Sequence, residues 1–272
     1  MVSEEIKILA EQYDIDLSKI KGSGPNGEVT LKDVEEYIKE QFFPKVKEER
    51  KIFGIRKVIA ERLSKSYREA VHVTLNMEAE MDSLIDVRKK LAEKLGTKPS
   101  YTVLMLKCIA KAIGDFIEIN ATMEEGKVMI YENVNINVAV DSPIGLITPV
   151  IRNVDKKPLE ELLHDYADIV ERAKSGRLKE KDFVGGTFTV TNLGMLGVDS
   201  FTPIINPPQI AILGLNRIAQ KPLVKDGDIR IANVMNLSLT FDHRAIDGAP
   251  AARFLGRVKH YLEHPEEVFS DE

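Results

Sequence analysis

Stretches with helical and strand-like spacing of apolar residues alternate along most of the chain. Apolar residues recur every three or four positions, as on one face of a helix, in residues 55–70, 82–94, 101–117 and 158–174. Residues 133–141 instead alternate apolar and polar side chains, which is typical of a strand with two different faces. Further strands are predicted at residues 145–151, 187–191, 209–213 and 229–241, the last after a hairpin turn at Asp226 and Gly227. This order of elements predicts an α/β domain with a mainly antiparallel or mixed sheet.

Residues 1–41 have a different pattern, which predicts a small helical module. Ser3 and Thr30 can each cap a short helix whose apolar residues lie on one face. A unit of this size buries little core, so its usual role is to carry a binding surface. Residues 42–51 are highly charged and contain a proline, which predicts a linker to a larger domain at residues 52–272.

The glycines between Gly22 and Gly27 have the spacing of a dinucleotide-binding loop. That mechanism needs a buried strand directly before the loop, and residues 14–21 are too charged and too short for a central parallel strand. The simpler interpretation is a structured connector, because glycine readily adopts the tight turns that such a connector needs.

Composition and charge exclude several classes of function. The chain has 272 residues, a net charge of -5 and no long basic run, so it lacks the electrostatic pattern of a nucleic-acid-binding protein. No apolar run is long enough to cross a membrane, and the N-terminus does not resemble a signal peptide. The only cysteine, Cys108, lies in an apolar segment and is predicted to be a buried thiol. We therefore expect a reducing location, the cytoplasm or, in a eukaryote, the mitochondrial matrix.

The candidate chemistry lies near the C-terminus. Along residues 235–243 the odd positions are apolar until His243, so its imidazole is expected on the face that turns toward packed structure. Four residues later Asp247 precedes a predicted helix, which would bring its carboxylate close to the histidine. A histidine held in this way can accept a proton from a thiol near neutral pH. The alternative is an ordinary strand-to-helix turn, with Asp247 as a helix cap and His243 as a satisfied core residue.

The stretch from Asp242 to Gly248 resembles the His-x-x-x-Asp-Gly motif of dihydrolipoyl acyltransferases and chloramphenicol acetyltransferase. Other segments are similar to the same family and together cover nearly all of the larger domain: residues 54–57, 145–150, 185–194 and 201–214. The N-terminal module resembles the peripheral subunit-binding domain of these acyltransferases, most clearly in residues 16–27 and 33–34. Both parts of the chain are thus similar to the acyltransferase component of a 2-oxo acid dehydrogenase complex.

This resemblance implies a chloramphenicol acetyltransferase-like fold and acyl transfer between dihydrolipoamide and coenzyme A. His243 would remove the proton from the attacking thiol, and Asp247 would support the site through hydrogen bonds or an ion pair with Arg56 or Arg244. Thr191 would stabilise the oxyanion of the tetrahedral intermediate, at a position where the family more often has serine. The alternative for Thr191 is a solvated stripe on one strand face, because threonine occupies alternate positions there.

The resemblance also implies partners. The family forms homotrimers with active sites between neighbouring subunits, His243 of one facing Thr191 of the next, and the trimers build a larger hollow core. Residues 1–41 would dock dihydrolipoyl dehydrogenase, a thiamine-dependent 2-oxo acid decarboxylase, or both, mainly through basic residues. Glu28 departs from that pattern, because the family usually has arginine or lysine at this position. The lipoyl group would be carried by an upstream domain, so we expect this sequence to be a truncated piece of a longer protein.

Two other functions stay open at this point. One is a stand-alone acyltransferase that uses the same histidine on a free small acceptor, and the other is a non-catalytic scaffold of the complex. The motifs are common to acetyl, branched-chain acyl and succinyl transfer, so they do not identify the acyl group or the size of the core. No metal, nucleic acid or membrane is expected as a partner.

Overall fold

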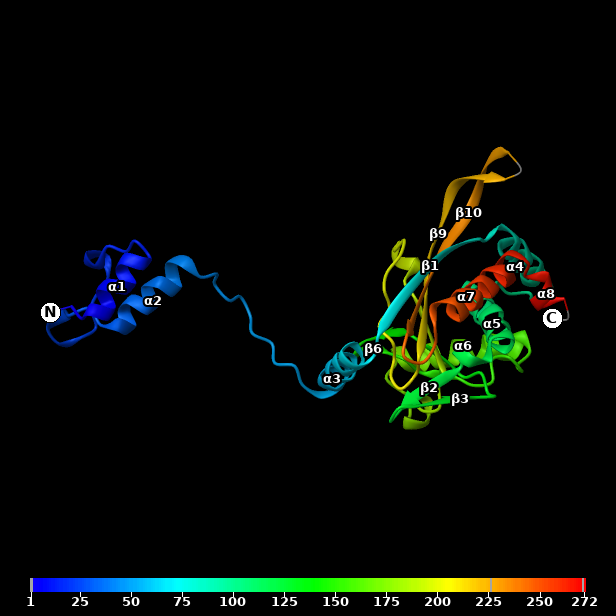
Figure 1. The fold of residues 1–272 in the computed structure, drawn as a ribbon, viewed down its shortest axis with the longest axis horizontal. Coiled ribbons are helices and arrows are strands. Elements are labelled where there is room, and N and C mark those ends of the chain that lie inside the picture. The colour runs from blue at the N-terminus through cyan, green and yellow to red at the C-terminus, as the bar shows by residue number, and fades with distance from the viewer. Residues whose placement is uncertain (1, 226, 271) are drawn as a thin grey trace. The chain divides into compact units, whose positions relative to one another are not determined.

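The computed structural model describes residues 2–225, 227–270 and 272, and it divides into two compact units whose boundary lies between Ile52 and Phe53. The small unit contains helices α1 (Glu4–Gln12) and α2 (Leu31–Phe42) and two short 3-10 turns, η1 (Leu17–Lys19) and η2 (Pro25–Gly27) (Figure 1). Both predicted helices are confirmed.

The helices of the small unit begin where the sequence predicts. The Ser3 side chain accepts a hydrogen bond from the Ile6 amide, and Thr30 and Asp33 form a reciprocal capping box at the start of α2. The two helices and the connector close over a small apolar core, formed by Ile6, Ile20, Val34 and Ile38. The helices of this unit are therefore set by capping contacts between residues that are close in the sequence.

The glycine-containing loop of the small unit is a structured connector. A Cβ at Gly22 would lie 2.3 Å from the Gly27 carbonyl oxygen, so only glycine fits there. The Asp33 carboxylate accepts hydrogen bonds from the backbone amides of Ser23 and Thr30, and these bonds hold its pKa well below the usual range. A 3-10 turn precedes the loop where a dinucleotide site would need a strand, so the nucleotide-binding alternative is wrong.

The large unit is built on a six-stranded sheet with strand order β1-β10-β9-β8-β4-β7 (Figure 1). The β4–β8 and β8–β9 pairs are parallel and the other pairs are antiparallel, which confirms the mixed sheet. The strands are β1 (His72–Glu80), β4 (Ile136–Val138), β7 (Val150–Ile151), β8 (Phe188–Asn192), β9 (Ala211–Lys225) and β10 (Asp228–Asp242). Two separate hairpins are formed by β2 (Ala121–Glu124) with β3 (Lys127–Ile130), and by β5 (Val140–Ser142) with β6 (Gly145–Ile147).

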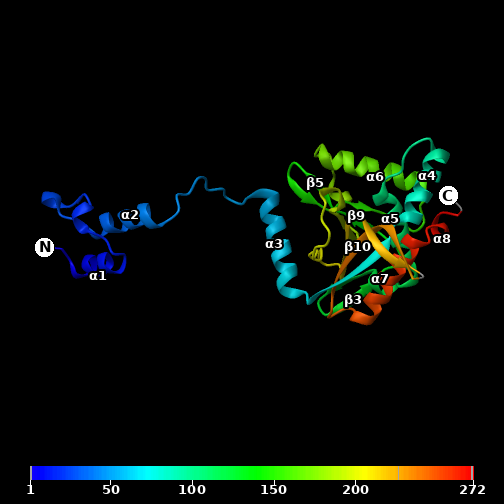
Figure 2. The same cartoon turned by 90° about the horizontal axis from the view of Figure 1, so that it is seen from above.

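Helices lie on both sides of this sheet. In both views α3 lies on the opposite side of the sheet from α4 and α5 (Figures 1 and 2). The helices are α3 (Gly54–Glu69), α4 (Asp82–Leu95), α5 (Tyr101–Asp115), α6 (Leu159–Lys174), α7 (Gly248–Glu263) and α8 (Glu266–Phe269), with 3-10 turns η3 (Ile117–Ile119), η4 (Glu180–Asp182) and η5 (Gly194–Leu196). Within the described ranges, none of these helices combines the length and the apolar character needed to cross a bilayer.

The two faces of the sheet have different chemistry. One face carries apolar residues that pack into the main core, such as the adjacent Val190, Leu213 and Leu239. The other face is also buried but polar, and its side chains bond to one another: Thr74 to Thr240 at 2.7 Å, Ser238 to Asn76 at 2.7 Å, and Gln209 to Asn137 at 2.6 Å. This second face carries Thr191.

Several predicted strands have different bounds. The predicted strand at residues 133–141 is divided into β4 and β5, and that at residues 145–151 is divided into β6 and β7 by a segment that contains Pro149. The strand predicted at residues 209–213 is much longer, because β9 continues to Lys225 as one arm of an antiparallel pair with β10. In the predicted hairpin turn between these arms, Asp226 lies outside the described residues, and Gly227 has a positive φ of 90°.

Candidate functional site

His243 lies at the turn that connects β10 to α7. Its backbone amide donates to the Val71 carbonyl oxygen at 2.9 Å, so the turn is attached to the start of β1. The imidazole Nδ1 lies 3.7 Å from Asp247 Oδ1, as the sequence predicts for residues four apart at a helix start. The His243 side chain is 42% exposed and Asp247 is 82% exposed, so the alternative of a packed core histidine is wrong. Asp247 occupies the helix-capping position, but its side chain makes no capping hydrogen bond.

The ring of His243 has one side against protein and another that is accessible. Phe241 supports it at a centroid distance of 5.7 Å. A Cβ at Gly248 would lie 4.0 Å from His243 Nε2, so the glycine leaves room beside this nitrogen. Nδ1 therefore faces a carboxylate, while Nε2 can meet a substrate.

Arg244 pairs with Asp242 and not with Asp247. Asp242 is buried and accepts hydrogen bonds from Arg244 Nη2 at 2.7 Å, from the Arg244 amide at 3.1 Å and from the Val71 amide at 3.2 Å. Burial disfavours ionisation of Asp242, but these bonds outweigh it and leave the pKa below its usual range. The expected Asp247–Arg244 ion pair is thus wrong, because the nearer buried carboxylate takes the guanidinium. Asp242 and Arg244 directly flank His243 in the sequence, and this spacing of opposite charges could have predicted their ion pair.

Arg56, the other arginine expected beside Asp247, lies near a different part of the unit. Its Nη2 is 3.6 Å from the position that a Cβ at Gly145 would occupy. No ion pair joins Arg56 to Asp247 within the described part of this chain. Among these residues, His243 is therefore the side chain that lies beside the Asp247 carboxylate.

Thr191 lies on β8, on the buried polar face of the sheet. Its strand neighbours Thr187 and Thr189 are buried too, so the solvated threonine stripe is wrong. Thr191 is 8% exposed, and its hydroxyl makes no hydrogen bond to any residue that the structure describes. The Phe201 ring covers the adjacent Gly214, where a Cβ would lie 2.7 Å from the ring. The Thr191 hydroxyl is thus shielded from solvent and can still donate a hydrogen bond to a ligand.

The structure does not bring Thr191 and His243 together within one chain. Thr191 lies in one row of the sheet with Gly214 and Ser238. His243 comes five residues after Ser238, a separation of about 16 Å at 3.3 Å per strand residue. His243 lies in the turn beyond the end of β10 and is 42% exposed, whereas Thr191 is buried within the sheet.

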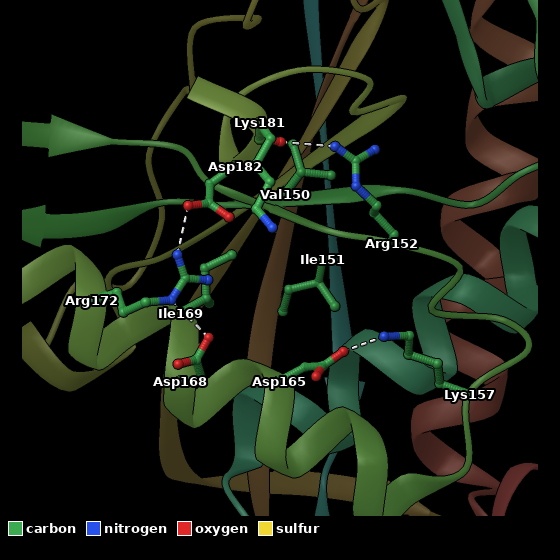
Figure 3. A pocket seen from close by; sticks show the side chains of 10 residues that line it. All are labelled: Val150, Ile151, Arg152, Lys157, Asp165, Asp168, Ile169, Arg172, Lys181 and Asp182. Atoms are coloured by element: carbon green, nitrogen blue, oxygen red, sulfur yellow. Dashed lines mark hydrogen bonds and ion pairs between the residues drawn. The ribbon is translucent and has the colours of Figure 1, made fainter. Parts of the chain in front are cut away.

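A charged cavity near α6 is occupied by a structural network (Figure 3). Arg172 bridges Asp168 at 2.8 Å and Asp182 at 2.5 Å, while Arg152 donates to the Lys181 carbonyl oxygen at 2.8 Å. Burial opposes ionisation of Asp182, but the bonds from Arg172 and the Lys179 amide leave its pKa lowered. The network holds η4 against α6. It also fixes residues 181–184, which lead into β8.

Cys108 is fully buried in α5, as predicted. Its Sγ contacts the Tyr261 carbonyl oxygen at 3.5 Å, and burial raises the pKa of the thiol. A thiol in this state is a poor nucleophile, which leaves the chemistry to the residues at the turn after β10.

Comparison with known proteins supports this description of the fold. Residues 44–270 match the family described as 2-oxoacid dehydrogenases acyltransferase (catalytic domain), and residues 6–35 match the e3 binding domain. The dihydrolipoyllysine-residue acetyltransferase component of the pyruvate dehydrogenase complex of Rickettsia felis is 36% identical over 270 residues. That alignment covers 95% of this chain and 66% of the relative, so the chain spans just under two thirds of that protein.

Solved structures have the same fold. The dihydrolipoamide acetyltransferase of Azotobacter vinelandii aligns with a TM-score of 0.77 and 35% identity, covering 83% of this chain and 98% of that one. The cubic core of a pyruvate dehydrogenase multienzyme complex aligns with a TM-score of 0.77 and 34% identity, covering 83% and 98%.

The mixed sheet, the histidine turn and these alignments define an α/β acyltransferase domain, which confirms the predicted fold class. The N-terminal helical unit is the one expected for subunit binding. The chain belongs to the acyltransferase family of the 2-oxoacid dehydrogenases.

Proposed function

We propose that this chain transfers an acyl group between dihydrolipoamide and coenzyme A within a 2-oxo acid dehydrogenase complex. One observation carries the proposal. The Azotobacter vinelandii structure comes from work on the roles of one serine, one histidine and one asparagine in the catalytic mechanism. Thr191 and Asp247 stand at the same intervals from His243 along this chain as that serine and asparagine stand from that histidine.

His243 acts as the general base. Its Nε2 takes the proton from the thiol of dihydrolipoamide or coenzyme A, and the resulting thiolate attacks the carbonyl carbon of the partner thioester. The carbon–sulfur bond to the leaving thiol then breaks, and the protonated His243 returns the proton to that sulfur. The open space beside Gly248 supports this role for Nε2.

Thr191 donates its hydroxyl hydrogen to the oxyanion of the tetrahedral intermediate. The shielded and unengaged hydroxyl supports this assignment, because a donor fixed in a dry site stabilises developing charge by about 3 kcal/mol. Threonine keeps the hydroxyl of serine, while its extra methyl group restricts the rotamer.

Asp247 positions the imidazole and does not move protons. Its carboxylate faces Nδ1, which favours the tautomer with the proton on Nδ1 and a free lone pair on Nε2. The asparagine at the same interval in the Azotobacter vinelandii protein supports a positioning role, because an amide oxygen can face Nδ1 as a carboxylate does but cannot take up a proton near neutral pH.

The active site forms between two copies of the chain in a homotrimer. The separation of Thr191 and His243 within one chain supports this arrangement. So does the tip of the β9–β10 arm, where Val224, Ile229 and Ile231 are 75%, 77% and 74% exposed and need a partner surface. The similarity to a cubic core suggests that trimers join into a larger shell.

The small unit docks dihydrolipoyl dehydrogenase, the thiamine-dependent decarboxylase of the complex, or both. Its match to the e3 binding domain supports the first of these partners. Glu28 places a negative charge where the family usually has a basic residue, so the partner surface that faces Glu28 should be less acidic than is usual. The acyl group arrives on a lipoyl group that belongs to a separate domain.

Acyl transfer to free dihydrolipoamide from acetyl-, isobutyryl- and succinyl-coenzyme A tests this function. The proposal predicts transfer from at least one donor, and the ranking of the donors identifies the acyl group. Absence of transfer from all three by the assembled protein would favour the scaffold alternative. Failure of immobilised dihydrolipoyl dehydrogenase to capture an active chain would favour a stand-alone acyltransferase.

A further inference from the structure

Two cavities of the large unit share Arg62 and Pro208 as lining residues. The first has a volume of about 650 Å³ and is bordered by Thr187, which directly precedes β8, the strand that carries Thr191. The second has a volume of about 550 Å³ and is bordered by Arg244, next to His243. Arg62 on α3 therefore lies between a cavity at the start of β8 and a cavity beside the turn that carries His243.

The first cavity is almost entirely neutral. Among the described residues that line it, Arg62 alone carries a charge. The amides around it already have partners: Asn137 donates to the Thr148 carbonyl oxygen at 2.6 Å, and Asn135 donates to the Gly185 carbonyl oxygen at 2.7 Å. Arg62 is thus the group in this cavity with most hydrogen-bonding capacity left for a ligand.

The guanidinium of Arg62 is held in place but not neutralised. Its Nη2 donates to the Pro207 carbonyl oxygen at 2.6 Å, and Ser66 on the same helix bonds the Ile205 carbonyl oxygen at 2.6 Å. Arg62 forms no ion pair with any described residue, and most of its five N–H donors are unused. The side chain is solvent-exposed in the single chain, yet the surrounding protein is dense enough to lower its pKa by desolvation.

The charges around the second cavity indicate on which side a ligand would lie. Positive and negative groups balance there, because its lining includes Arg62, Lys65 and Arg244 together with Glu69, Glu124 and Glu125. Arg244 is also paired with Asp242. An anion would therefore meet less repulsion on the side of the first cavity, where no carboxylate competes for Arg62.

We propose that Arg62 binds an anionic oxygen group of a substrate, either a phosphate of coenzyme A or a carboxylate at the end of the acyl chain. The planar guanidinium fork matches both groups in a two-bond geometry. This inference rests on the proposed acyl transfer and adds a residue that selects among its substrates.

Kinetics with three acyl donors distinguish the two sources of the anion. The donors are acetyl-coenzyme A, succinyl-coenzyme A and S-acetylpantetheine, which lacks phosphate, each with dihydrolipoamide as acceptor. Arg62→Gln is compared with Arg62→Lys, which keeps the charge, and with Lys57→Gln, which removes a charge from the same helix but lines neither cavity. We expect Arg62→Gln to lower kcat/KM by about tenfold or more, mainly through KM, with partial recovery in Arg62→Lys.

Comparing the loss of kcat/KM among the three donors identifies the anion that Arg62 binds. A phosphate ligand predicts equal losses with both coenzyme A donors and none with S-acetylpantetheine, whereas an acyl carboxylate predicts a loss with succinyl-coenzyme A only. Equal losses with all three donors, or no loss with any, would overturn the proposal. Calorimetric titration of succinyl-coenzyme A into wild type and Arg62→Gln gives an independent answer: equal affinities reject the role of Arg62 even if the wild type transfers no acyl group.

Discussion

Thr191 shares a row of the sheet with Ser238, and His243 comes five residues after Ser238, in the turn beyond the end of β10, a separation of about 16 Å at 3.3 Å per residue. A hydroxyl and an imidazole so arranged cannot act on one carbonyl group within a single chain. Their cooperation requires that the two groups come from different chains.

Mixing two inactive variants tests this arrangement. Thr191→Val and His243→Ala chains should each be nearly inactive alone, but co-expression should restore activity. About a quarter of the sites are then complete, because each site needs the two variant chains in one order. Acyl transfer by the purified mixture measures the recovery. A mixture as inactive as the separate variants would place both groups in one chain.

Asp247 can be tested by two substitutions that separate charge from hydrogen bonding. Asp247→Asn keeps an oxygen opposite Nδ1 and should retain kcat within about threefold of wild type, whereas Asp247→Ala removes that oxygen and should lose about tenfold. Steady-state rates under saturating coenzyme A measure both effects. Equal, large losses in the two variants would indicate that the carboxylate itself moves a proton.

Asp33 should control the small unit alone. Asp33→Asn weakens the bonds to the Ser23 and Thr30 amides, so hydrogen exchange in residues 22–34 should accelerate by about tenfold while residues 53–272 keep their protection. Capture by dihydrolipoyl dehydrogenase should weaken and acyl transfer should not change. Glu35→Gln, an exposed change on the same helix, is the control. Unchanged exchange in Asp33→Asn would show that these bonds do not hold the connector.

Asp182 should make the large unit sensitive to acid. Because the pKa of Asp182 is lower in the folded state, its ionised form stabilises the fold above the unfolded pKa of about 3.9. This contribution is lost as the pH falls through the lower folded value. Asp182→Asn should therefore reduce the free energy of unfolding by about 1 to 3 kcal/mol at pH 7 and by less near pH 3.

Chemical denaturation followed by circular dichroism measures the effect of Asp182→Asn. Asp168→Asn is the matched control, because Asp168 bonds the same arginine but is about half exposed. It should change the free energy of unfolding by less than about 1 kcal/mol. A difference between Asp182→Asn and wild type that does not shrink at low pH would contradict the assigned cause.

Local signals explain which parts of the fold could be predicted from the sequence. Ser3 and Thr30 cap helices through contacts within three residues, so a sequence pattern suffices. The long β9 arm could not be predicted, because Gly214, Asn216 and Pro222 interrupt its apolar alternation. Gly214 lies against the Phe201 ring, Asn216 bonds Ser238 on the neighbouring strand, and Pro222 lies in the exposed part of the arm. The contacts of Gly214 and Asn216 come from residues distant in the sequence.

The site was predictable only in part, because some of its contacts join residues that are distant in the sequence. His243 and Asp247 are four residues apart, so helix geometry alone brings them close. The pairing of Asp242 with Arg244 is also local, but the further bond that Asp242 accepts from the Val71 amide, just before β1, depends on distant sequence. The role of Arg62 depends on contacts with residues near position 207, and no local pattern reports such contacts.

The most direct test of the central claim is acyl transfer from the preferred acyl-coenzyme A to dihydrolipoamide by His243→Ala. We expect kcat to fall at least about a hundredfold while the variant stays assembled, because the thiol then lacks its base. His164→Ala, which removes an exposed histidine from α6, should leave the rate unchanged. A His243→Ala protein that transfers acyl groups at a rate close to that of wild type would show that His243 is not the base.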